Sequence, residues 1–388
     1  MPLSTADLKT LESHFEQGGV DQVLDFLEQR FRVEHSYFKL FEVLKMRCRH
    51  RLGLSLTYGP ESESLTEPQQ RQLEDGLLAA CRDVGTQLMH HGQLAEGWMY
   101  LHPVGDRDLN ESLIRSLTVT EDNLETILEI AFHQAAAPSY GYQLLIEHFG
   151  TCNAITTFDT QAHRFEKHQQ QAMAEMLVQQ LYRELCLSLV SVLERERQTA
   201  TEPNHLTAIL AEHPWLIEGG AFHIDTTHLA SVMRIARVIE KPAELMKALE
   251  LANYGHRLHP DFQYPSAPPF EDTYPDHAHF FRALLGQRVD EAVAHFRAKC
   301  ESVDPNQHGT VAWETLANFL TRVGRRSEAI KVVADHVIGH NEPLGIAPQL
   351  LDIPETSDQW REVQNVCTIQ GDLLGTAVAM LKSSTDQS

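Results

Sequence analysis

Apolar residues recur along most of the chain at intervals of three and four positions, the spacing of a helix that buries one face. Residues 5–17 and 20–32 have this spacing, and Gly18 and Gly19 between them predict a break. Further helices are predicted at 35–52, 67–91 and 168–199. No convincing series of segments alternates between apolar and polar residues, as strands would. The pattern therefore predicts an all-α protein.

Four segments share the pattern of a turn between two packed helices: 91–98, 286–292, 324–330 and 371–378. Each has a glycine, which suits the end of a helix, and then a small residue that lets the next helix pack closely. At these turns the chain resembles tetratricopeptide-like repeats, over about half of its length. The period is irregular, with 38 residues from Gly286 to Gly324 and 47 from Gly324 to Gly371. The resemblance implies an irregular array of helical hairpins similar to an α-solenoid, and it implies no chemistry.

Two non-helical stretches suggest how the chain is organised. The sequence Thr-Ala-Thr-Glu-Pro-Asn at 199–204 follows a long helical pattern and predicts a boundary between an N-terminal half, 1–200, and a C-terminal half, 201–388. The stretch 256–275 contains five prolines together with tyrosines and phenylalanines. Long loops in folded proteins are usually functional or disordered. We expect an ordered, aromatic flap within 256–281.

The charge balance limits the classes of partner. Among 388 residues, 54 Asp and Glu outnumber 32 Lys and Arg, which gives a net charge of −22 with neutral histidine. Such a chain repels phosphate backbones and anionic lipid, so we expect neither nucleic acid nor a membrane as partner. No run approaches the roughly 18 consecutive apolar residues of a membrane span.

Two further features bear on location. The first residues lack a basic region followed by an apolar core, so we expect no secretory signal. The six cysteines are scattered and form no CxxC pair, which is typical of reduced thiols in a cytoplasmic protein. We therefore expect a cytoplasmic protein.

Histidine is the unusual component of the composition, with 22 in the chain and nine of them between 205 and 295. Within this region, His223, Asp225 and His228 surround a predicted helix start, with Asp225 as the N-cap and His228 at the third helical position. Two imidazoles beside a carboxylate suit a divalent ion such as zinc, manganese or iron. The alternative is that Asp225 only caps the helix, His223 is buried and His228 faces water.

A metal site would need a third ligand, for which His133, His102 and His277 are the candidates in that order. His277 follows Asp276, which the sequence suggests as a second N-cap. With Asp225, the histidines His256 and His259 at the entrance to the flap are the expected catalytic residues. The alternative for His102 and His133 is that they lie at helix C-termini, where the helix dipole favours histidine.

These observations leave two functions open. The first is a metal-dependent enzyme that acts on a small polar substrate in a helical groove, whether as hydrolase, lyase or isomerase. The second is a non-catalytic scaffold of tetratricopeptide-like hairpins that binds a peptide or a helix. The histidines and the aromatic flap favour the enzyme. The absence of the motifs GxGxxG, GxxxxGK[ST], GxSxG and HExxH favours the scaffold. The sequence does not indicate an oligomeric state.

Overall fold

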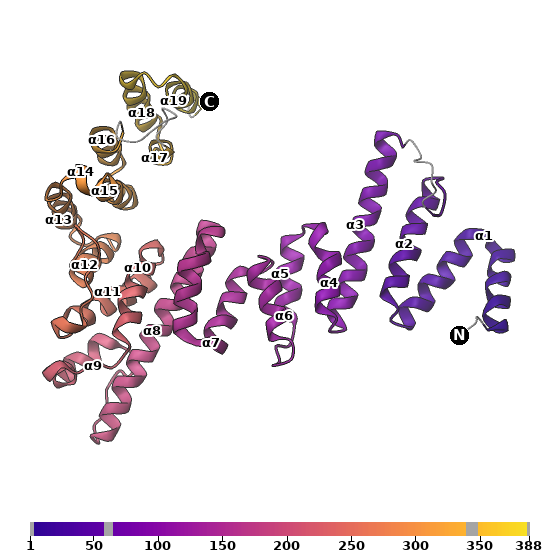
Figure 1. The fold of residues 1–388 in the computed structure, drawn as a ribbon, viewed down its shortest axis with the longest axis horizontal. Coiled ribbons are helices and arrows are strands. Elements are labelled where there is room, and N and C mark those ends of the chain that lie inside the picture. The colour runs from indigo at the N-terminus through magenta and orange to yellow at the C-terminus, as the bar shows by residue number, and fades with distance from the viewer. Residues whose placement is uncertain (1–3, 58–64, 339–347, 386–388) are drawn as a thin grey trace. The chain divides into compact units, whose positions relative to one another are not determined.

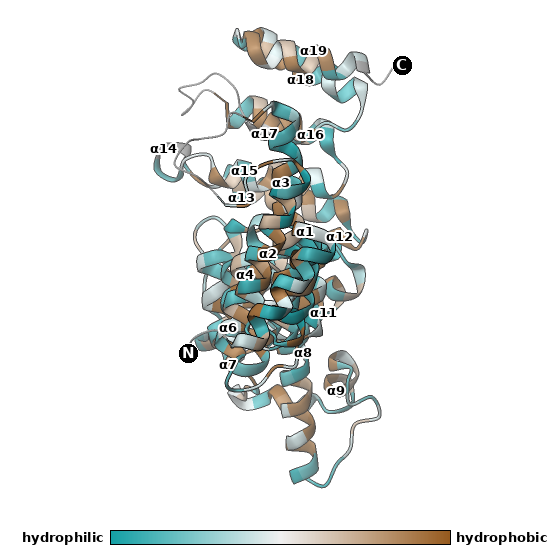
Figure 2. Cartoon of the chain, turned by 90° about the vertical axis from the view of Figure 1, so that its right-hand side faces the viewer, coloured by the Kyte–Doolittle hydropathy of each residue, from teal (hydrophilic) through white to brown (hydrophobic). Residues whose placement is uncertain are grey.

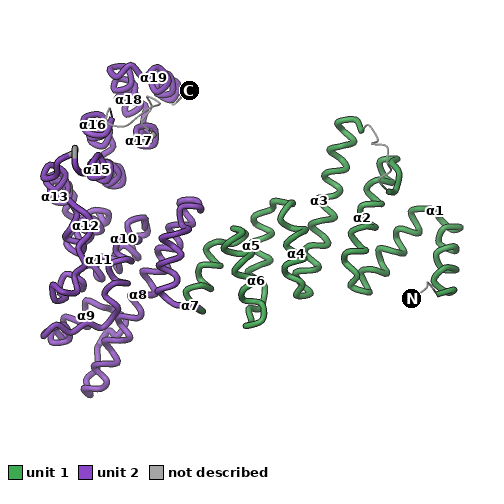
Figure 3. Tube along the Cα trace, viewed as in Figure 1, with its two compact units in different colours: residues 1–148 green, residues 149–388 purple. Residues whose placement is uncertain are grey.

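The computed structural model describes residues 4–57, 65–338 and 348–385, and within these ranges it contains helices and no strand (Figure 1). The all-α prediction is confirmed. The chain divides into two compact units, 1–148 and 149–388 (Figure 3). In each unit the helices pack mainly against their neighbours along the chain, as in an array of helical hairpins.

Unit 1 is built from helices that follow one another closely along the chain. They are α1 (Thr5–Val33), α2 (Tyr37–Arg51), α3 (Glu67–His90), α4 (Leu94–Leu101), the 3₁₀ turn η1 (His102–Val104), α5 (Arg107–Ser116), α6 (Leu124–Leu128), the π-helical turn η2 (Glu129–His133) and the first part of α7 (Pro138–Gln161). The predicted break in α1 is confirmed, because Gly18 and Gly19 have non-helical backbone angles. A core centred on Trp98, Leu101 and Ile127 joins α4 to α6.

Unit 2 continues from the later part of α7 through the rest of the chain. Its elements are η3 (Ala162–Arg164), α8 (Lys167–Arg195), α9 (Leu206–Glu212), η4 (Pro214–Gly220), α10 (Thr226–Ile235), η5 (Ala236–Val238), α11 (Pro242–His256), η6 (Pro260–Phe262), α12 (Thr273–Leu284), α13 (Val289–Glu301), α14 (Pro305–His308), α15 (Val311–Arg322), α16 (Arg326–His336), α17 (Pro348–Leu351), α18 (Ser357–Gln370) and α19 (Leu373–Thr385).

Helix α8 is a central element of unit 2 and packs against α10 and α11. Its buried side chains include Leu177, Leu181, Leu185 and Leu189, which recur every four residues along one face. Among the described helices, α8 alone is long and apolar enough to cross a membrane by length and composition. A core helix passes the same test, so the expectation that the chain has no membrane partner stays a prediction.

The hairpin turns have the predicted glycine geometry. Gly92, Gly286, Gly324 and Gly371 all lie in the left-handed region, with φ between 74° and 79°. A side chain is strained there, which explains the glycines. The small residues expected to open the next packed face, Gly97, Ala292 and Ala329, are buried.

The two predicted non-helical stretches both lie in unit 2. Helix α8 ends at Arg195 and α9 begins at Leu206, so 199–204 connects two helices of that unit. A division into 1–200 and 201–388 stays a prediction. The flap lies between α11 and α12, at 257–272, and contains the short turn η6. Phe262 packs against Phe222 and Phe270 against Phe296, with ring centroids 4.8 and 5.9 Å apart.

Candidate functional site

Asp225 is the N-cap of α10, as the sequence predicts. One carboxylate oxygen accepts hydrogen bonds from the backbone N–H groups of Thr227 (2.8 Å) and His228 (3.2 Å), and from the Thr227 hydroxyl (2.6 Å). The hydroxyl is the main reason that the pKa of Asp225 lies below its usual value. The carboxylate therefore stabilises the helix start as an N-cap.

His223 and His228 flank this helix start. The backbone N–H of His223 donates to the Tyr254 hydroxyl at 3.0 Å, which ties the segment before α10 to α11. The ring atom Nδ1 of His223 is buried and has no hydrogen-bond partner among the described residues. Burial lowers the pKa of His223, so its neutral form is favoured. His228 is half-buried.

Asp276 is not an N-cap, which corrects the sequence prediction. Helix α12 starts at Thr273 after Asp272, so Asp276 lies within the helix and is buried. Its carboxylate accepts hydrogen bonds from His295 Nε2 at 2.7 Å and from Lys299 Nζ at 3.0 Å, both on α13. This buried group fastens α12 to α13.

His277, beside Asp276, is also buried. Its Nδ1–H donates to the Thr273 carbonyl at 2.5 Å, while Nε2 is buried without a hydrogen-bond partner in the described part of the chain. Burial lowers the pKa of His277 to about 4. The imidazole is therefore a neutral part of the core at pH 7.

The other candidate histidines occupy helix ends. His102 is the C-cap of α4 and packs edge-on against Trp98, and His133 is the last residue of η2, with its ring edge-on to Phe132. Exposed His256 ends α11. Exposed His259 caps η6 by accepting a hydrogen bond from a backbone N–H. The alternative interpretation of His102 and His133 as residues of helix C-termini agrees with these positions.

In the described ranges, no group of three or more His, Cys, Asp or Glu side chains is arranged to hold a metal ion. His102 and His133 belong to unit 1, and the other candidates to unit 2. A metal shared by His223, His228 and a third histidine, with Asp225, His256 and His259 as catalytic residues, stays a prediction. So does the identity of the metal as zinc, manganese or iron.

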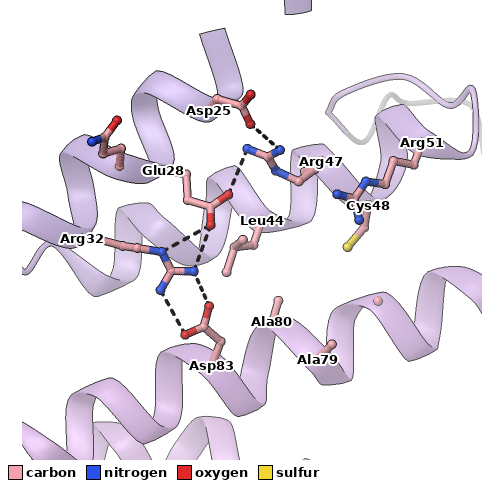
Figure 4. Close-up of a pocket in the computed structure, with 12 residues that line it drawn as sticks. Asp25, Glu28, Arg32, Leu44, Arg47, Cys48, Arg51, Ala79, Ala80 and Asp83 are labelled. Atoms are coloured by element: carbon pink, nitrogen blue, oxygen red, sulfur yellow. Dashed lines mark hydrogen bonds and ion pairs between the residues drawn. The ribbon is translucent and has the colours of Figure 1, made fainter. Parts of the chain in front are cut away.

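A cleft of about 640 Å³ in unit 1 lies between α1, α2 and α3, and charged side chains line it (Figure 4). Arg32 pairs with Asp83 and with Glu28 (2.9 Å), and Arg47 pairs with Asp25 (2.6 Å) and Glu28 (2.9 Å). Each of the three carboxylates is thus engaged by an arginine. This network joins three helices, and with Arg51 the cleft is lined by three arginines and three carboxylates.

In the hairpin of α18 and α19, the two helices pack through small side chains. Helix α19 places small residues against α18: Gly375 and Ala379 are buried, and a Cβ on Gly375 would lie 2.8 Å from Cys367 Sγ. Ala377, which the sequence suggests for the packed face, is only half-buried. Since small residues face α18, the larger apolar side chains of α19 are left on its outer side.

We call this outer side the α19 face. Its members are large apolar side chains of α19 with exposed fractions between 52% and 83%, and they are Leu373, Leu374, Met380 and Leu381. Figure 2 shows α19 with apolar stretches in brown. Large exposed apolar patches usually mark interaction sites. The sequence indicates the side on which α19 packs, because Gly375, Ala379 and Ser383 recur every four residues and define a small-residue face.

No family model, curated protein or solved structure matches this chain. The helical hairpins are compatible with a repeat fold, and a fold of this kind does not specify a function. The functional interpretation therefore depends on what the surfaces of the molecule can bind.

Proposed function

We propose that this protein is an interaction scaffold, an irregular array of tetratricopeptide-like helical hairpins that binds an amphipathic helix of a partner protein at the α19 face. The exposed aliphatic side chains of α19, opposite its buried small residues, carry this proposal. In hairpin arrays each helix is covered by the next, and a partner helix on α19 would continue the pattern by which α16 packs against α18.

The apolar area is sufficient to drive binding. Full burial of one Leu, Ile or Met side chain contributes roughly 1.5–3 kcal/mol. Leu373 is 83% exposed and Leu381 63% exposed, so a partner can still bury most of each side chain. The two residues lie eight positions apart on the same side of α19, and a helix with apolar residues at intervals of three and four would cover both.

Charge favours a different protein over a second copy. The whole chain carries a net charge of −22, so two copies repel each other at low ionic strength. The hairpin of α18 and α19 itself carries three acidic residues, Asp358, Glu362 and Asp372, and two basic ones, Arg361 and Lys382. A partner helix with basic residues beside its apolar stripe would complement this end of the chain.

The proposal is tested by the native mass of the protein purified from its own cells at its natural level. We expect a mass above the 43.9 kDa of one chain, with a different protein as the second component. Leu373→Glu and Leu381→Glu should each return the mass to that of one chain. Val311→Glu is the matched control, because Val311 is an exposed aliphatic residue at the first position of α15, as Leu373 is in α19.

Three results would contradict the proposal. The wild-type protein could have the mass of one chain, the partner could stay bound to both leucine variants, or the added mass could be a second copy. Circular dichroism of each variant should stay helical, since the changed side chains are exposed.

A further inference from the structure

A second cavity, in unit 2, is lined by three basic side chains, and two of them, both arginines, form no ion pair with a carboxylate among the described residues. Its volume is about 620 Å³, within the range of pockets that hold small organic ligands. Lys167 at the start of α8, Arg237 of η5 and Arg322 at the end of α15 contribute its positive charges.

Arg322 is held in a fixed orientation. Its guanidinium donates hydrogen bonds to the backbone carbonyls of Arg237 and Ile239, and it lies 5.4 Å from the centre of the Phe280 ring. Among the described residues, it forms no ion pair with a carboxylate. Burial lowers the pKa of Arg322, while the nearby carboxylate of Glu240 acts in the opposite direction.

Arg237 is the more available of the two guanidinium groups. Its Nε donates to the Arg234 carbonyl at 3.1 Å, and no carboxylate in the described ranges pairs with it. The side chain reaches solvent, yet the surrounding protein and the charge of Arg234 lower its pKa. Arg234 differs, because both of its terminal nitrogens lie 2.8 Å from the Asp159 carboxylate oxygens.

The rest of the lining restricts the ligand. Lys167 is paired with Glu240 at 2.9 Å, so the two arginines are the basic side chains of the lining without an ion-pair partner among the described residues. Glu314 and Asp352 also line the cavity and would repel a ligand that is anionic throughout. They would accept hydrogen bonds from hydroxyl or amino groups.

We propose that this cavity binds a small organic anion whose carboxylate or phosphate is held by Arg237 and Arg322 and whose body carries hydroxyl or amino groups. The planar guanidinium of Arg237 presents paired donors that match the oxygens of either anion. Glu314 and Asp352 would hold the polar body of the ligand. This site is separate from the α19 face and does not depend on the function proposed for that face.

Three probes with a shared sugar body test this site by isothermal titration calorimetry: glucose 6-phosphate, glucuronate and glucose. We expect at least one anionic sugar to bind and neutral glucose not to bind. Binding of only the phosphate or only the carboxylate identifies the recognised group, and binding of both shows that either is accepted. Higher salt should weaken the interaction.

Variants then assign the binding to the arginines. Arg237→Gln should weaken binding at least about tenfold, since a hydrogen bond to a charged group is lost. Arg325→Gln is the control, because this substitution removes the same charge from unit 2. Arg325 pairs with Asp290 and Glu328 and does not line the cavity. Absence of binding by both anions, equal binding of glucose, or unchanged affinity in Arg237→Gln would overturn the proposal.

Discussion

The buried imidazole of His277 should make the protein sensitive to acid. In the folded chain its pKa is lowered to about 4, because burial disfavours the charged form and Nε2 has no partner within the described residues. In the unfolded chain the pKa returns to about 6.5. A histidine with a lowered pKa stabilises the fold only above the unfolded pKa, and this stability is lost as the pH falls towards 4.

The size of the effect follows from these two values. Between pH 7 and pH 5 the unfolded chain takes up a proton at His277 while the folded chain does not. The linkage relation gives a loss of about 2 kcal/mol in the free energy of unfolding over this interval. That is a substantial part of the 5–15 kcal/mol typical of folded proteins.

Urea denaturation at pH 7 and pH 5 would measure this loss. The comparison is between the wild-type protein, His277→Phe and His168→Gln, where the last removes an exposed histidine from α8. His277→Phe is expected to lose about 2 kcal/mol less than wild type between the two pH values, and His168→Gln to lose as much as wild type. An equal pH dependence in wild type and His277→Phe would refute the reasoning.

Three other predictions concern stability and reactivity. Gly255→Ala should lower the melting temperature, because a Cβ there would lie 2.3 Å from the buried Tyr274 ring. Overpacking of this kind costs about 1–3 kcal/mol. An unchanged or higher melting temperature would contradict this contact. Asp276→Ala should lower the free energy of unfolding by about 1–3 kcal/mol, since it removes the buried acceptor of His295 and leaves Lys299 with the exposed Asp272 alone. A loss as small as that of the exposed Asp290→Ala would show that the buried group contributes little. Burial raises the pKa of Cys186 to about 11 and that of Cys300 to about 12. Iodoacetamide should therefore modify exposed Cys152 first, as mass spectrometry would show. Early modification of Cys300 would be inconsistent with its burial.

Local features of the fold could be predicted from the sequence because their causes are local. A glycine such as Gly324 ends a helix since only it adopts the left-handed conformation without strain. Asp225 caps α10 because its side chain reaches the N–H groups that follow it. The prediction of Asp276 as an N-cap was wrong, although Pro275 indicated that α12 begins earlier, because proline suits the first turn of a helix.

The functional surfaces could not be predicted in the same way, because they depend on contacts between distant segments. Periodicity shows that α19 has two faces, but only packing shows that the small face meets α18 and the aliphatic face stays exposed. Arg237 and Arg322 are 85 residues apart, and nothing in either local sequence indicates that they share a cavity. The excess of histidine indicated a metal site, and no group of three or more His, Cys, Asp or Glu side chains in the described ranges is arranged as one, so that site stays a prediction.

A photo-crosslinking residue at position 374 would test the proposed scaffold most directly. Placed in the chain within its own cells, it should give one discrete adduct, and mass spectrometry should locate the crosslink in an amphipathic helix of a different protein. The same residue at position 311, also exposed but distant in sequence from α19, should not give this adduct. The absence of an adduct at position 374, or the same adduct from both positions, would contradict a binding function for the α19 face.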